Sequence, residues 1–275
     1  MVQQTSLQSN DIVSIDARNA GKMGAVWLVG AGPGDADLLT VKAVKAIQQA
    51  DVIFFDFLIS EEILALLPSE TEKVCVGKRK GYHSLSQDEI NELLFKYAKQ
   101  GKDICRLKGG DAFVFGRGGE EMQFLMQRGV QVELVPGITS GMGATSYAGI
   151  PVTHRGVSQG CTFITAHAEK ELNVDWQALA QLKHTLVFYM GLSKASLISG
   201  SLMVNGLSKR TPVALIENGC RQNQRVITGQ LDELALLSKR HQVKSPALIV
   251  VGETVNLSSQ LSWFNAQLEP QKISA

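Results

Sequence analysis

Short apolar runs alternate with helix-like patterns through the first half of the chain. Residues 25–30 and 51–58 are too short for buried helices, so they predict buried strands. Between them, five apolar residues are spaced to form one face of a helix: Leu38, Leu39, Val41, Val44 and Ile47. This alternation predicts repeated βα units that build a parallel sheet.

The rest of this half continues the alternation. Ser86, with Glu89 three residues later, resembles a capping box and predicts that a helix over 87–100 begins there. The other predicted elements are a helix at 61–67, strands at 73–77 and 103–111, a helix at 120–128 and a strand at 130–137.

Four more apolar runs predict a second α/β lobe with its own sheet; they cover 161–167, 184–191, 211–219 and 246–253. The small-residue segment 136–151 predicts a tightly packed helix and the connection between the lobes. The expected fold class is therefore α/β, with two α/β domains, and the length of the chain leaves an intervening cleft open as a possibility. We expect a flexible N-terminal tail over 1–23, domains over 24–137 and 138–257, and a C-terminal tail over 258–275.

The composition narrows the class of protein. The 275 residues are 44% hydrophobic and 19% charged, which is typical of a folded globular protein. A formal net charge of +1 provides no global field for nucleic acid. No apolar stretch reaches the roughly 20 residues of a membrane-spanning helix, and the polar start is no secretory signal. We therefore expect a cytoplasmic protein with no nucleic-acid or membrane partner.

The cysteines predict no metal site. Cys75, Cys105, Cys161 and Cys220 are widely scattered and form no CxxC pair or Cys/His cluster with zinc-ligand spacing. We expect buried thiols in a reducing compartment.

Glycine is unusually common, with 26 residues, and suggests places where the backbone approaches a ligand closely. The segment GAGPGD, residues 30–35, follows a predicted strand and precedes a predicted helix. Pro33 interrupts its spacing, and a dinucleotide fingerprint would place glycine at Asp35. A ligand-binding loop and a purely structural turn both fit this segment.

Two longer segments are also rich in glycine. RLKGGDAFVFGRGGEE, residues 106–121, places Arg117 between glycines, where it would either fix loop carbonyls or bind a carboxylate. VPGITSGMGATSYAGIPVTHR, residues 135–155, permits close helix packing. Its Thr139 and Ser140 also offer hydroxyls and amides at a predicted helix start.

Taken in order, these segments resemble the signatures of the tetrapyrrole methylase family, in the group that methylates uroporphyrinogen III: VGAGPGDADLLT, DVIFFDFL, VGKRKG, RLKGGDAFVFGRGGEE and VPGITSGMGATSYAGIPVTHR. The resemblance runs from about residue 24 to 255 and is looser after 155, where YMGL and ALIENGC carry it. It implies a homodimer that transfers methyl groups from S-adenosylmethionine to C2 and C7 of uroporphyrinogen III. The products would be S-adenosylhomocysteine and, through precorrin-1, precorrin-2 for siroheme or cobalamin. Since the resemblance starts so early, we expect oxidation and iron insertion to be performed by another protein.

The resemblance also implies the cofactor-binding residues: Pro33, Gly109, Gly110, Asp111, Val114, Thr139, Ser140, Met190 and Gly219. The chain has Ala112 where proline is common after the GGD, and Ser140 where alanine is common. Both changes keep a small side chain, so we expect cofactor binding to persist.

Two residues are candidates for proton transfer. Methylation of a pyrrole carbon needs alignment above all, and the methylated ring must then lose a proton to a base. Asp56 ends a predicted parallel strand, where open sheets place active groups. The resemblance implies that it accepts the proton, while a turn-capping aspartate also fits. Lys78 matches the family's proton donor, although its ordinary pKa of ~10.4 suggests that its charge matters more.

The substrate that the resemblance implies is a polycarboxylate, so basic residues near the glycine segments would form a local rim for it. The candidates are Arg106, Lys108, Arg117 and Arg155, with Lys78, Arg79 and Lys80 beside them. His154 would either assist them or form a structural hydrogen bond.

Three other interpretations remain open from the sequence. A methylase of the same fold could act on a later corrin intermediate. A nicotinamide-dependent dehydrogenase would use GAGPGD and Asp56, but it leaves the later glycine segments unexplained. A non-catalytic binding module is the third alternative.

Overall fold

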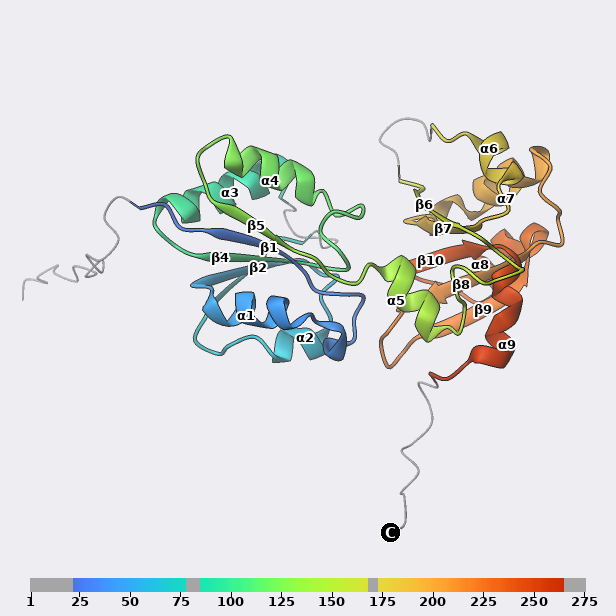
Figure 1. Ribbon diagram of the computed structural model, residues 1–275, viewed down its shortest axis with the longest axis horizontal. Helices are drawn as coiled ribbons and strands as arrows, with labels where there is room; N and C mark the ends of the chain where they lie inside the picture. The colour runs from blue at the N-terminus through green and yellow to red at the C-terminus, as the bar shows by residue number, and fades with distance from the viewer. Residues whose placement is uncertain (1–21, 78–84, 168–172, 265–275) are drawn as a thin grey trace, which may run out of the picture.

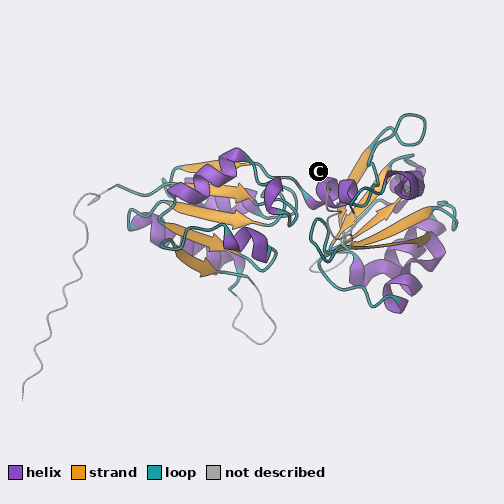
Figure 2. Cartoon of the chain, turned by 90° about the horizontal axis from the view of Figure 1, so that it is seen from below, coloured by secondary structure: helices purple, strands orange, loops and turns teal. Residues whose placement is uncertain are grey.

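The computed structural model describes residues 22–77, 85–167 and 173–264 and has two lobes, each built on a five-stranded sheet (Figure 1). The view turned by 90° shows the same separation into two groups of strands (Figure 2). The predicted α/β class with two lobes is confirmed. The predicted tails 1–23 and 258–275 lie largely outside the described residues, and the domain boundaries stay a prediction.

The N-terminal sheet is entirely parallel, as predicted, in the order β3-β2-β4-β1-β5. Its strands are β1 (Val26–Gly30), β2 (Val52–Phe55), β3 (Glu72–Cys75), β4 (Ile104–Lys108) and β5 (Val132–Val135). Helices α1 (Val41–Gln49) and α2 (Glu61–Ala65) cover one face, while α3 (Gln87–Lys99) and α4 (Gly118–Met126) cover the other (Figure 1). A short 3-10 helix, η2 (Ala36–Leu38), precedes α1.

The helix start predicted at Ser86 is confirmed. The amide of Glu89 donates to the Ser86 hydroxyl at 3.2 Å, and the amide of Ser86 donates to the Glu89 carboxylate at 2.7 Å. These reciprocal bonds satisfy backbone donors that α3 itself leaves without partners.

The apolar face predicted between the first two strands is wrong in part. The helix α1 begins only at Val41, after the cap Thr40, and buries Ala43, Ala46 and Ile47. Val41 is 73% exposed. Because the small alanines let α1 approach the sheet closely, they form the core contact in place of the larger valines.

The C-terminal sheet is mixed, in the order β6-β7-β10-β8-β9, with β10 antiparallel to both of its neighbours. Its strands are β6 (Cys161–Thr165), β7 (Thr185–Tyr189), β8 (Pro212–Glu217), β9 (Arg225–Gln230) and β10 (Ala247–Val251). The sequence predicted four of these strands and missed β9. This edge strand alternates exposed and half-buried residues, so it lacks a continuous apolar run.

Helices cover both faces of this second sheet. On one face lie α6 (Trp176–Gln181), α7 (Ala195–Val204) and α8 (Leu234–Arg240), with the 3-10 helices η3 (Leu192–Lys194) and η4 (Leu231–Glu233). On the other face lies α5 (Ser140–Tyr147), followed at the end of the chain by η5 (Glu253–Leu257) and α9 (Ser258–Leu261). Of the described helices, none is long and apolar enough to cross a membrane.

Candidate functional site

The three glycine segments meet at the carboxyl edge of the N-terminal sheet. The backbones of Gly32 and Gly110 exchange two hydrogen bonds, at 3.0 and 2.7 Å. Gly137, on the connection to the second lobe, packs so closely that a Cβ atom there would lie 2.5 Å from the Gly110 carbonyl oxygen. Glycine is therefore required for this crossing of backbones.

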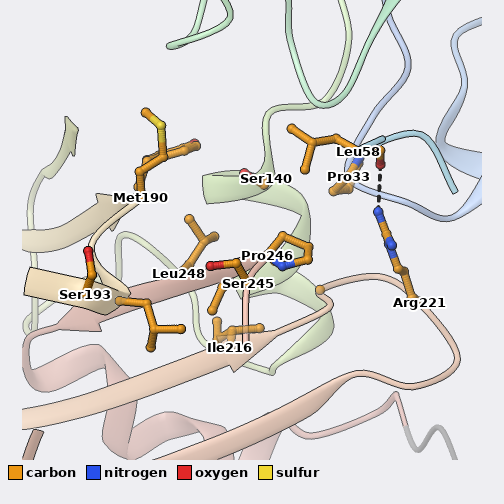
Figure 3. A pocket seen from close by; sticks show the side chains of 15 residues that line it. Pro33, Leu58, Ser140, Met190, Ser193, Ile216, Arg221, Ser245, Pro246 and Leu248 are labelled. Carbon is orange, nitrogen blue, oxygen red and sulfur yellow. Dashed lines mark hydrogen bonds between the residues drawn. The ribbon is translucent and has the colours of Figure 1, made fainter. Parts of the chain in front are cut away.

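Two adjacent cavities open between the lobes beside these loops. The larger, of about 470 Å³, includes Pro33, Leu58, Ser140, Tyr189, Met190, Gly219 and Arg221 in its lining (Figure 3). The smaller, of about 180 Å³, is lined among others by Asp56, Lys108, Gly109, Gly110, Val114 and Thr139. Pro33, Leu58, Ser140, Tyr189, Met190 and Arg221 line both, so the two cavities form one interlobe cleft.

The interlobe cleft brings together all the predicted cofactor residues except Asp111. The Asp111 carboxylate accepts hydrogen bonds from the backbone amides of Phe113 at 2.8 Å and Gly137 at 3.0 Å. It thus fixes the GGD loop to the interlobe connection. These two bonds explain why an acid follows the glycines.

A hydroxyl pair fixes the start of α5 in the cleft. The Tyr189 hydroxyl accepts a hydrogen bond from the Gly141 amide at 2.7 Å and lies 2.7 Å from the Thr139 hydroxyl. Burial raises the pKa of the Tyr189 phenol. Thr139 was predicted to stand at a helix start, and α5 begins directly after it.

Asp56 borders a buried group of charged side chains, formed by Arg106, Lys108 and Glu121. The Glu121 carboxylate, whose side chain has no solvent exposure, accepts a hydrogen bond from Lys108 at 2.9 Å and lies 3.4 Å from Arg106. The Arg106 guanidinium also lies 3.8 Å from the Asp56 carboxylate. Burial, with a smaller contribution from Arg106, lowers the pKa of Lys108, while Glu121 opposes this shift. The four charges balance, which makes their burial tolerable.

Asp56 itself occupies the predicted position directly after β2, with its side chain 23% exposed. Its carboxylate accepts a hydrogen bond from the Leu58 amide at 3.0 Å, so it caps the following turn. It also lines the smaller cavity and a third cavity of about 620 Å³. Asp56 is therefore both a turn cap and a carboxylate open to a ligand.

The third cavity adjoins the interlobe cleft at Met190 and is lined among others by Arg106, Phe113, Phe115 and Arg117. The Arg117 guanidinium forms an exposed ion pair with Glu120, with its Nη2 2.6 Å from the carboxylate. This ion pair also lowers the pKa of Glu120.

The remaining candidate cations lie elsewhere. Arg155 is exposed and does not line any of these three cavities. The neighbouring His154 bonds through its ring to the Arg155 carbonyl, as the structural alternative predicts. Lys78, Arg79 and Lys80 lie outside the described residues.

The cysteines follow the prediction only in part. Cys105 and Cys220 are buried and Cys161 is half-buried, but Cys75 is exposed because β3 is an edge strand.

Three important residues were missed from the sequence. Glu121 resembled an ordinary acid at a helix start, and its role as a buried counter-charge depends on the packing of α4 against β4. Tyr189 immediately precedes Met190 in the cleft, and this adjacency was the available signal. Arg221 follows two residues after Gly219, in a polar stretch without a pattern.

Two α/β lobes with a glycine-lined cleft between them define the class of this protein. The family model for tetrapyrrole (corrin/porphyrin) methylases matches residues 25–235, and the chain belongs to this family. The match favours a methylase over the dehydrogenase and binding-module alternatives.

Individual relatives agree with the family. A siroheme synthase of Photobacterium profundum is 50% identical over 259 residues, which are 94% of this chain and 55% of the relative. The chain thus spans about half the length of the curated relatives it matches.

Solved structures match over nearly their whole length. The uroporphyrin-III C-methyl transferase of Thermus thermophilus, crystallised with S-adenyl homocysteine, has a TM-score of 0.74 and 39% identity. The match covers 85% of this chain and 94% of that one. A cobalt precorrin-4 methyltransferase has a TM-score of 0.75 at 25% identity, with 84% and 95% coverage.

Proposed function

We propose that this chain methylates uroporphyrinogen III at C2 and C7 with S-adenosylmethionine, giving precorrin-1 and then precorrin-2. The observation that carries the proposal is the interlobe cleft. Eight cofactor residues implied by the sequence line it, and a relative of 39% identity was crystallised with S-adenyl homocysteine. Its higher identity, compared with 25% for the precorrin-4 enzyme, favours uroporphyrinogen III over a later corrin intermediate.

The interlobe cleft fits the cofactor in size and chemistry. Its larger cavity of about 470 Å³ falls within the roughly 300–1,000 Å³ of small-molecule sites. Pro33, Met190 and Leu248 supply apolar walls, and Ser140 supplies a polar group. Arg221 lines both cavities and adds a positive charge to their walls.

S-adenosylmethionine supplies an electrophilic methyl group bonded to a sulfonium. The chain holds the donor between the glycine loops and the start of α5, which Tyr189 fixes in place. Residues of both lobes line the site and would hold the donor between them. Holding the reactants in line is the main contribution of such a site and requires no covalent intermediate.

Asp56 accepts the proton that the methylated ring must lose. Its carboxylate is partly exposed at the border of the interlobe cleft and the third cavity, and both Leu58 and Arg106 fix its orientation. A positioned carboxylate of this kind typically contributes 10²–10⁴-fold to the rate, as a rough estimate. Lys78 remains the proposed proton donor.

The third cavity is the proposed site of the tetrapyrrole. At about 620 Å³ it is the largest of the three, and it combines the rings of Phe113 and Phe115 with the cation Arg117. Arg106 and Lys108 already neutralise Glu121 and Asp56, so they would act on the substrate by positioning the Asp56 carboxylate. Arg155 is kept as a contact for an outer substrate carboxylate.

The cellular setting is also proposed by analogy. Precorrin-2 would serve siroheme or cobalamin synthesis, in line with relatives named siroheme synthase. A cytoplasmic homodimer without nucleic-acid or membrane partners is the arrangement we propose, and light scattering of the purified chain tests the dimer.

Anaerobic incubation with uroporphyrinogen III and S-adenosylmethionine tests the reaction. Mass spectrometry is expected to detect a tetrapyrrole heavier by two methyl groups, and none when the chain is omitted. If the chain binds S-adenosylmethionine tightly but transfers no methyl group, the cofactor site is supported and uroporphyrinogen III is rejected as the acceptor.

A further inference from the structure

Arg221 joins the two lobes at the interlobe cleft. It lies in the turn after β8, two residues beyond Gly219, and lines both cavities of the cleft. Its Nη2 donates a hydrogen bond of 2.6 Å to the carbonyl oxygen of Leu58, in the loop between β2 and α2 (Figure 3). A side chain of the C-terminal lobe therefore binds the backbone of the N-terminal lobe.

The loop that Arg221 binds is the loop that carries Asp56. The Asp56 carboxylate accepts a hydrogen bond from the Leu58 amide at 3.0 Å. The Asp56 side chain thus binds the amide of Leu58, and the Arg221 side chain binds the carbonyl of the same residue. Because Leu58 is held from both sides, displacement of Arg221 would loosen the turn that orients Asp56.

The first glycine loop is shaped around the Arg221 side chain. Gly34 has a φ of +151°, and a Cβ atom there would lie 2.7 Å from the Cγ and 3.1 Å from the Nε of Arg221. The Gly34 carbonyl accepts a hydrogen bond of 2.6 Å from Ser60, at the end of the Asp56 loop. Arg221, the first glycine loop and the Asp56 loop therefore pack as one unit.

The environment of Arg221 is unusual for a surface arginine. Burial lowers its pKa, and the charge of Glu62 partly opposes this shift. Its Nε has no hydrogen-bond partner within the described part of the chain. The guanidinium is instead fixed by the bond from its Nη2 to the Leu58 carbonyl and by packing against Gly34.

We propose that Arg221 is a positioning residue, which holds the Asp56 loop against the C-terminal lobe and closes the cofactor cleft at that side. Its effect on methyl transfer rests on the function proposed above. Its effect on the loop does not, and it is measurable in the free protein.

Three variants separate these roles. Arg221→Met keeps an unbranched side chain against Gly34 but has no donor, while Arg221→Lys keeps a charge and a donor. Arg240→Gln is the matched control, because it removes an exposed arginine at the end of α8. Circular dichroism and thermal melting establish that each variant is folded. If Arg221→Met does not fold, Arg221→Lys is used in its place to test the proposal.

Hydrogen–deuterium exchange of the free protein measures how often the backbone of the Asp56 loop opens. In Arg221→Met we expect the amides of Leu58 and Ile59 to exchange about tenfold faster, since opening of the turn exposes them. Arg221→Lys should give an intermediate rate and Arg240→Gln the wild-type rate. Unchanged exchange in folded Arg221→Met would overturn the proposal.

Calorimetric titration measures the affinity of the interlobe cleft for S-adenosylmethionine. Arg221→Met should raise the Kd about tenfold, with partial recovery in Arg221→Lys.

A double-mutant comparison measures turnover. Arg221→Met should lower turnover far less in an Asp56→Asn background than in the wild type, because the carboxylate that Arg221 positions is then absent. Fully additive effects, or a wild-type Kd, would refute the positioning role. If Arg221→Met exchanges faster in the loop but the wild-type protein does not bind S-adenosylmethionine, the result would support the contact between Arg221 and the Asp56 loop and reject the proposed function.

Discussion

The guanidinium of Arg106, in the middle of β4, lies 3.8 Å from the carboxylate of Asp56, which directly follows the neighbouring parallel strand β2. The same arginine lies 3.4 Å from the buried carboxylate of Glu121, which also accepts hydrogen bonds from Lys108 and Gln87. The proposed base is therefore the partly exposed end of a buried and charge-balanced group. Its position depends on residues that no ligand needs to touch.

Glu121→Gln should destabilise the fold strongly. The change leaves Arg106 and Lys108 buried with only the charge of Asp56 nearby, and breaking a buried pair in this way costs about 3 kcal/mol. Urea unfolding measures the loss. The control is Glu120→Gln on the adjacent exposed residue, which should change stability by less than about 1 kcal/mol. Equal effects of the two variants would show that the buried cluster does not contribute as described.

Asp56→Asn should slow methyl transfer strongly while sparing the cofactor site. The amide cannot accept a proton, so turnover should fall by roughly 10²–10⁴-fold. An asparagine oxygen can still cap Leu58, so the Kd for S-adenosylmethionine should remain near that of the wild type. Asp88→Asn, on the exposed start of α3, is the control. A variant with full turnover would remove Asp56 from the mechanism, and lost cofactor binding would assign it a structural role.

Tyr189→Phe should weaken both the fold and the cofactor site. It leaves the buried amide of Gly141 without its acceptor, at a cost of about 1–3 kcal/mol. The start of α5 should then be less well fixed, and the Kd for S-adenosylmethionine should rise. Tyr97→Phe removes an exposed hydrogen bond to Glu72 and should leave that Kd unchanged. If both variants bind the cofactor equally well, the Tyr189 hydroxyl does not organise the cleft.

The cysteines should differ widely in reactivity at pH 8. Burial raises the pKa of both Cys105 and Cys220 to about 12, from an ordinary value of 9.0. A raised pKa means less of the reactive thiolate at this pH, and Cys75 is exposed. Timed maleimide labelling with mass spectrometry should therefore modify Cys75 first and the two buried thiols last. Rapid labelling of Cys220 in the folded protein would contradict its burial.

Much of the architecture could be predicted from local patterns. The first two strands, β1 and β2, are continuous apolar runs, and the Ser86 capping box marks α3 directly. The glycine segments also predicted close approaches of the backbone, and Gly137 indeed has no room for a side chain. Here local sequence and final structure agree, so the pattern is sufficient.

The rest depends on tertiary packing. The edge strand β9 is too polar to show an apolar run, and α1 packs through alanines that carry little hydrophobic signal. Glu121 and Arg221 have no distinctive spacing, and their partners are remote in the sequence or on the other lobe. Such contacts are set by which elements lie side by side, which a local pattern does not encode.

The most direct test of the central claim locates the transferred methyl groups. Uroporphyrinogen III is incubated anaerobically with the purified chain and S-adenosylmethionine carrying a carbon-13 methyl group, and the tetrapyrrole is examined by carbon-13 NMR. We expect two labelled methyl carbons, bonded to C2 and C7 of the macrocycle, and no others. Labelled methyl groups on other ring carbons, or an unlabelled macrocycle despite bound cofactor, would show that the proposed reaction is wrong.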